Sequence, residues 1–327
     1  MARIIRHPLV ERILLSLKTA NDWLVAKLVG LLLHFAKKLP PHRSIDAAER
    51  LARFLSPILP RTRLARKSLA NAFPEKSAAE IKQMSRGVWG NVGRTIAEYV
   101  FLDDLIDINL DSPTDGRIEV VGIDQFVKVR ESERPVVIFT AHTGNWEILP
   151  VAAAAYDLNI TALFRPPNNR FLAKRVLKAR KTEGGHLVPS RAGAAWALAS
   201  VLDNNGAVGL LSDQAFNRGP RIKFMGLEAS ANPLAAKLAR QFDCDIHPAR
   251  CVRLPGGRFR IELHPAIEIS RKENGSVDLQ ATTQTIADIV ESWVREYPEQ
   301  WLWLHDRWKL KPPNKRREAA DAAHNRR

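Results

Sequence analysis

The sequence predicts an α/β protein, in which a mixed, mostly parallel central sheet is flanked by helices and preceded by a helical N-terminal region. Two observations predict this fold class. Residues 42–110 carry apolar side chains at helical spacing, and after the polar cluster Asp111–Gly116 short apolar runs alternate with helical stretches. The 327 residues, 45% of them hydrophobic, are enough to bury a substantial core. A disordered or collagen-like chain is therefore excluded.

The basic charge is concentrated at the two ends of the chain. The formal net charge is +15, and residues 1–70 contain 14 Lys and Arg against 4 Asp and Glu. Residues 309–327 contain 7 against 2, whereas residues 71–308 are balanced at 29 of each. Such a distribution favours contact between the ends and an anionic surface, for which nucleic acid and anionic lipid both qualify.

Hydrophobic patterning in the first segment favours lipid. The apolar stretch from Trp23 to Ala36 has 14 residues and includes Lys27 and His34, whereas a membrane-spanning helix needs about 20 apolar residues. We therefore expect residues 1–41 to form a basic, amphipathic membrane-associating segment that lies in the interface. An amphipathic helix packed on the core is the alternative. The helical spacing is carried by Leu24, Leu28, Leu31, Leu32 and Phe35.

Residues 42–311 are predicted to form one domain, followed by a basic, mobile tail at 312–327. The first part of the domain, 42–110, is helical, and its second part, 111–311, is the α/β core. Two cysteines are too few for a disulfide framework, and Cys244 and Cys251 are expected in the core on a pair of strands. The individual elements are helices at Ile45–Leu55, Thr62–Ala72, Ala78–Phe101 and Leu279–Tyr297, and a hairpin formed by Asp245–Arg253 and Arg258–Pro265.

Three predicted strands each end in a polar cluster. The run 135–141 leads into His142, the run 159–164 into residues 165–169, and the run 206–211 into Ser212-Asp213-Gln214. In open α/β sheets, ligands bind beyond the carboxyl ends of the strands, so these clusters are expected to converge on one site. The alternative is that polar residues simply terminate buried strands.

The segment from His142 to Glu147 is the strongest candidate for chemistry. Gly144 lets the backbone turn between the two side chains, so the imidazole can act as a base while the carboxylate orients it. No second histidine lies nearby for a zinc site, and neither a glycine-rich phosphate loop nor a G-x-S-x-G elbow is present. We therefore expect no metal, no cofactor and no acyl-enzyme, and predict direct attack by an acceptor.

The other two clusters supply candidates for substrate binding. Arg165 can hold a phosphate or a developing oxyanion, and Asp213 can position a substrate hydroxyl or Arg165 itself. Structural ion pairing is the alternative for both residues. Asn168, Asn169 and Gln214 complete the set of predicted substrate-binding residues.

From about residue 64 to 310 the chain resembles the late acyltransferases of lipid A biosynthesis, the lauroyl and myristoyl transferases within the lysophospholipid acyltransferase group. The resemblance rests on motifs that occur in a specific order. They are Asn71-Ala-Phe-Pro-Glu75, His142–Glu147, Phe164-Arg165-Pro166 with Asn168-Asn169, Ser212-Asp213-Gln214, Lys223-Phe-Met-Gly226 and Pro298-Glu-Gln-Trp-Leu-Trp-Leu-His305.

The resemblance implies that acyl carrier protein donates a fatty acyl thioester. It implies as acceptor the hydroxyl of a 3-hydroxyacyl chain on a Kdo-bearing lipid A precursor, with His142 as the base and Glu147 as its partner. The expected location is the cytoplasmic face of the inner membrane, where the basic ends contact anionic lipid. Ser212, Met225 and Asp306 depart from the family pattern, so acyl length and acceptor position stay open.

Two other functions remain alternatives. A glycerophospholipid or glycolipid O-acyltransferase would use the same catalytic pair on another acceptor. A non-enzymatic protein that binds membrane or nucleic acid would explain the pI of about 10.1 but gives His142 no role. Nucleic acid is not expected as a partner, because the basic tail from Lys309 has no aromatic residues for stacking on bases.

Overall fold

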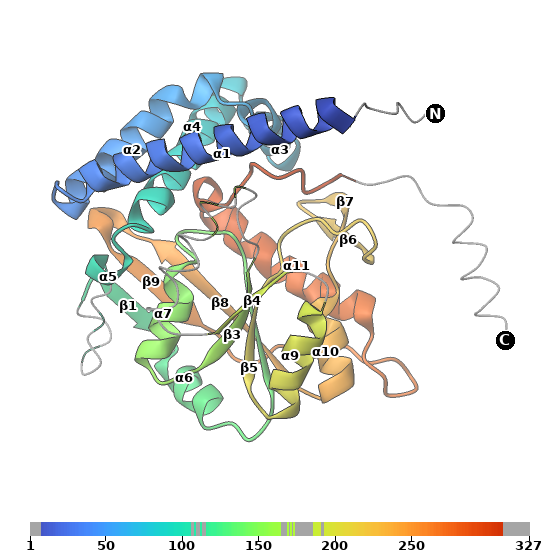
Figure 1. The fold of residues 1–327 in the computed structure, drawn as a ribbon. Helices are drawn as coiled ribbons and strands as arrows, with labels where there is room; N and C mark the ends of the chain where they lie inside the picture. The colour runs from blue at the N-terminus through green and yellow to red at the C-terminus, as the bar shows by residue number, and fades with distance from the viewer. Residues whose placement is uncertain are drawn as a thin grey trace.

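The computed structural model describes residues 8–105, 108, 112, 116–164, 169, 171, 173, 186–190 and 193–309. It confirms a mixed α/β fold with a mostly parallel central sheet flanked by helices (Figure 1). The predicted basic tail at 312–327 lies outside the described residues.

Seven strands form the central sheet in the order β1-β9-β8-β2-β5-β3-β4. Neighbouring strands pair in parallel except β8 and β9, which form the predicted antiparallel hairpin. A separate antiparallel pair, β6-β7, follows β5 in the chain. The strands are β1 (Ile118–Val121), β2 (Val136–Thr140), β3 (Ile160–Phe164), β4 (His186–Pro189), β5 (Ala207–Leu211), β6 (Arg221–Phe224), β7 (Leu227–Ser230), β8 (Asp245–Arg253) and β9 (Phe259–Leu263).

Helices cover both faces of the sheet. Because side chains alternate along β2, Val137 and Phe139 pack into one core with α9, α10 and α11, while Val136 and Ile138 pack into a second core with α6 and α7. Asp278 caps α11 by accepting hydrogen bonds from the backbone N–H groups of residues 280 and 281. The helices are α6 (Ile123–Arg130), α7 (Ile148–Ala155), α9 (Ala194–Asp203), α10 (Leu234–Phe242) and α11 (Leu279–Glu296).

The N-terminal helices form a layer across one end of the sheet (Figure 1). Helix α4 begins with a capping box, in which Ser77 and Glu80 exchange hydrogen bonds, and it packs extensively against α2. This layer contains α1 (Pro8–Ala36), α2 (Pro41–Leu55), α3 (Thr62–Ala72) and α4 (Ala78–Glu98), and the short helix α5 (Leu102–Leu105) follows α4 in the chain. Short 3-10 turns are η1 (Ser56–Ile58), η2 (Pro255–Gly257) and η3 (Pro298–Gln300).

The predicted elements agree closely with the structure, apart from local differences. The first predicted helix begins at Pro41 rather than Ile45. The third predicted helix ends at Glu98 rather than Phe101, because a turn separates α4 from α5. Both cysteines are buried as expected, but they do not lie on a pair of strands, since Cys251 is on β8 and Cys244 directly precedes that same strand.

Helix α1 presents apolar side chains to solvent along much of its length. They include Leu17, Trp23, Leu24, Leu31 and Phe35, all of them at least half exposed. Its far end is fixed to the body by a hydrogen bond from Ser44 Oγ to the carbonyl of Ala36. In the part of the chain that the structure describes, no helix combines the length and the apolar character that crossing a bilayer requires.

Candidate active site

His142 lies in the loop between β2 and α7, at the carboxyl end of the central strand. The loop turns at Gly144, whose φ of +58° is in the left-handed region. A Cβ atom at this position would lie 2.1 Å from the carbonyl oxygen of Cys251, so only glycine fits against β8. The turn was expected from the sequence, and the structure shows why its glycine is required.

The imidazole of His142 pairs with Asp213. Nδ1 of the ring lies 2.8 Å from Oδ1 of Asp213, and the backbone N–H of His142 donates to Oδ2 at 2.9 Å. Sheet register explains the pair. Thr140, the last residue of β2, lies opposite Leu211, the last residue of β5, and His142 and Asp213 each stand two residues beyond these strand ends. The indole N–H of Trp301 donates a third hydrogen bond to Asp213, at 2.8 Å.

These contacts keep Asp213 ionised. Burial alone would raise the pKa of this carboxyl, but the charge and hydrogen bonds of His142, with the Trp301 hydrogen bond, lower it to about 2. An ionised carboxylate accepts hydrogen bonds only, so Nδ1 of His142 carries the ring proton and Nε2 is left as the basic nitrogen. Gln214 Nε2 lies 3.5 Å from that nitrogen. The arrangement suits general base catalysis.

Asp213, rather than Glu147, therefore occupies the position expected for the carboxylate that orients His142. The physical reason is the Gly144 turn, after which Asn145 is buried and Glu147 serves as the N-cap residue of α7. Glu147 Oε1 accepts a hydrogen bond from Trp146 Nε1 at 3.0 Å, and both side chains line the same cavity as His142. A catalytic part for Glu147 stays a prediction.

An apolar cavity of about 240 Å³ opens beside His142. It lies between α7 and the face of the sheet formed by β2, β5 and β3, and extends from His142 down to Ile138, about 13 Å along β2 at the rise of an extended strand. Small residues, Ala162 and Gly209, line its wall between the strands. Its other apolar lining includes Phe126, Leu149, Leu158, Ile160, Leu163, Phe164 and Leu210.

A buried polar network holds the loop that carries His142. Glu98 of α4 forms an ion pair with Arg253 of β8 and accepts a hydrogen bond from Asn145 Nδ2 at 3.0 Å. Asn91 Nδ2 donates to the carbonyl of Gly144 at 3.3 Å. The loop is thereby fixed to α4 and β8, so the His142 backbone is positioned before any substrate arrives.

The segment after α11 closes the site on a second side. The backbone N–H of Leu302 donates to the carbonyl of His142 at 3.0 Å, and that of Gly144 donates to the carbonyl of Gln300 at 3.1 Å. The ring of His305 lies 6.2 Å from that of His142. Sequence reasoning assigned no role to Trp301 or His305, although both stand in the Pro298–His305 motif.

The other predicted substrate-binding residues have different outcomes. Arg165 and Asn168 lie outside the described residues. Asn169 does not belong to the cavity lining. Its Nδ2 donates to the carbonyl of Asp22 at 2.7 Å, which links the segment after β3 to α1. Its role as a substrate-binding residue stays a prediction.

A base–carboxylate pair at the end of an apolar cavity suits an enzyme that acts on a group with an apolar chain. Residues 10–310 match the family described as bacterial lipid A biosynthesis acyltransferase, and the chain belongs to that family. It is also 25% identical over 197 residues to a phosphatidylinositol mannoside acyltransferase of Mycolicibacterium smegmatis (strain ATCC 700084 / mc(2)155). That alignment covers 59% of this chain and 62% of the relative, so it spans less than two thirds of the relative's length.

Proposed function

We propose that this acyltransferase moves a fatty acyl chain from acyl carrier protein to the hydroxyl of a 3-hydroxyacyl chain on a Kdo-bearing lipid A precursor. One observation carries the proposal most directly: the His142–Asp213 pair stands at the end of an apolar cavity. The cavity suits the acyl chain, and the pair suits activation of a hydroxyl. Family membership supports the acceptor class.

The geometry supports a single transfer with no acyl-enzyme. His142 Nε2 takes the proton of the acceptor hydroxyl as its oxygen attacks the thioester carbonyl, and ionised Asp213 stabilises the imidazolium that forms. The new C–O bond replaces the C–S bond, and the proton then passes from His142 to the departing thiolate. The cysteines are poor nucleophiles, because burial raises the pKa of the Cys251 thiol to about 12.

A glycolipid or glycerophospholipid acceptor is the second candidate. It is favoured by the resemblance to a phosphatidylinositol mannoside acyltransferase, which shares a quarter of its aligned residues with this chain. Both candidates use the same base, so the acceptor must be identified from the product.

We also propose that the enzyme works at the cytoplasmic face of the inner membrane without a cofactor. Support for membrane contact comes from the exposed apolar residues of α1 and from Lys18 and Lys27 on the same helix. An amphipathic helix with this composition binds an anionic interface by combining apolar burial with charge attraction.

Mass spectrometry of lipid A tests the function. A strain that lacks the gene should lose one secondary acyl chain, and the wild-type gene should restore it. His142→Ala should fail to restore it, because the base is gone. Restoration of the chain by His142→Ala would refute the mechanism, and an unchanged lipid A in the deletion strain, with another acylated lipid lost, would refute the acceptor.

A further inference from the structure

A second cavity lies away from the catalytic pair, on the side formed by α10, the start of α11 and the loop before β6. It is a groove of about 810 Å³ lined by four cationic side chains, Arg218, Lys237, Arg240 and Lys272. Lys237 and Arg240 stand three positions apart on α10, so they point from the same face of the helix. Asp278 is the single carboxylate of the lining.

The positive charge of this groove is largely uncompensated. Across the described part of the chain, none of the four cations forms an ion pair, whereas neighbouring Arg271 pairs with Asp243. The Asp278 carboxylate is occupied in capping α11, where it accepts two backbone N–H hydrogen bonds. Four positive charges around one groove therefore attract an anionic partner.

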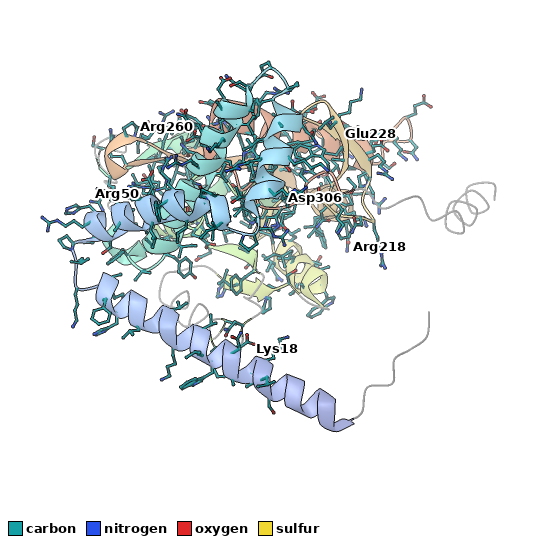
Figure 2. The ribbon with its side chains drawn as sticks, turned by 90° about the horizontal axis from the view of Figure 1, so that it is seen from above. Lys18, Arg50, Arg218, Glu228, Arg260 and Asp306 are labelled. Atoms are coloured by element: carbon teal, nitrogen blue, oxygen red, sulfur yellow. The ribbon has the colours of Figure 1, made fainter. Side chains whose placement is uncertain are left out.

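The composition of the groove favours a soluble protein over a lipid surface. Exposed large apolar side chains are concentrated on α1 and α2, with others such as Trp196 and Phe216 scattered over other elements, and none of them lines the groove. The apolar residues that line the groove are instead buried or partly buried, and they include Pro220, Val277 and Leu279. Figure 2 shows Arg218 beside the β6–β7 hairpin, at the opposite end of the view from Arg50 on α2. None of the described residues that line the groove stands on α1–α4, so a partner in the groove contacts other elements.

The groove shares a segment with the active site. Arg218 stands five residues after Asp213, and five residues span at most about 18 Å when extended. The segment is anchored where Ala215 bridges to Ala231 and where the N–H of Ala231 donates to the carbonyl of Pro220. An acyl thioester on a flexible arm can therefore reach from a partner seated in the groove toward His142.

We propose that this groove is the docking site for the acidic acyl carrier protein that delivers the acyl thioester. The assignment rests on the proposed function, since it names the place where the proposed donor binds. Attraction between the four cations and acidic carrier side chains raises the association rate and fixes the orientation of the carrier.

Donor kinetics test the assignment with matched double charge reversals. Lys237→Glu/Arg240→Glu removes the two cations of α10, and Lys128→Glu/Arg130→Glu on α6 is the control, since its residues are exposed and lie on the opposite face of the sheet. The groove variant should raise KM for acyl carrier protein donor about tenfold or more at low salt, and lose most of this effect at high salt. Its rate with an N-acetylcysteamine thioester of the same acyl chain should match wild type, which also shows that it folds.

The outcomes separate the two proposals. Equal KM values for wild type and the groove variant, with acyl carrier protein as a good donor, overturn the groove assignment alone. A wild-type enzyme that rejects acyl carrier protein but accepts another thioester overturns the proposed donor and the groove with it. If the groove variant instead loses affinity for phosphatidylglycerol vesicles while its carrier KM is unchanged, the groove binds lipid and the assignment is wrong.

Discussion

Two buried carboxylates, Asp213 and Glu262, have pKa values lowered to about 2, against ordinary values of 3.8 and 4.5. Burial would raise both values, and it is overcome at Asp213 by His142 and at Glu262 by hydrogen bonds and charge from His264 and Arg250. A carboxyl with a lower pKa in the folded state stabilises the fold above its unfolded pKa. That contribution is lost as the pH falls from about 4.5 toward 2.

We therefore predict that the fold weakens steeply in acid. Titration of these two carboxyls should change the urea midpoint, followed by tryptophan fluorescence, only slightly between pH 7 and 5. It should lower the midpoint between pH 5 and 3. Glu262→Gln should lower the urea midpoint at pH 7, because Arg250 loses its buried carboxylate partner. The expected loss in free energy of unfolding is roughly 3 kcal/mol. The same substitution should also make the urea midpoint depend less steeply on pH between pH 5 and 3.

The control for this prediction is Glu228→Gln, which changes an exposed carboxylate on β7 (Figure 2). It should leave the midpoint and its pH dependence as in wild type. An acid dependence that is equally steep in Glu262→Gln and in wild type would contradict the assignment of the effect to this carboxyl.

At the scale of the elements, the depth of the cavity is set where β3 and β5 pair. Ala162 lies opposite Gly209 in the register, and both small residues line the cavity wall. Larger side chains there would fill the space that we propose an acyl chain occupies, at a cost of about 1–3 kcal/mol per misplaced methylene.

Ala162→Leu should accordingly shift the enzyme to shorter acyl chains. We expect kcat/KM for the longest accepted donor to fall at least about tenfold relative to a donor two carbons shorter, measured with a series of acyl thioesters. Thr161→Val is the control, since Thr161 points to the other face of β3. An equal loss of kcat/KM for every acyl chain length in Ala162→Leu would show that this part of the cavity does not determine chain-length preference.

The sequence predicted most of these elements, because their patterns are local. The runs at 135–141, 159–164 and 206–211 became the adjacent strands β2, β3 and β5. The clusters after β2 and β5 meet at His142 and Asp213, whereas most of the cluster after β3 lies outside the described residues. The strands β1, β4, β6 and β7 were not predicted. They are four residues long, and the β6–β7 turn uses Met225 and Gly226 at positive φ, which leaves a weak signal.

At the scale of the whole molecule, the site depends on contacts that no local pattern reveals. His142 and Asp213 are 71 positions apart, and the sheet register that joins them cannot be read from spacing. Trp301 joins them from beyond α11, and Glu98 supports the loop from the N-terminal layer. The sequence therefore singled out His142 as the predicted base, whereas pairing it with Asp213 required the order of the strands.

The fold makes Asp213 the carboxylate that pairs with His142. The most direct measurement compares kcat for acyl transfer by purified Asp213→Asn and Glu147→Gln with that of wild type. We predict that Asp213→Asn lowers kcat by roughly 10²–10⁴-fold with little change in KM, because the basic tautomer of His142 is lost. Glu147→Gln should lose less. A kcat near wild type for Asp213→Asn, with the large loss in Glu147→Gln instead, would contradict the account.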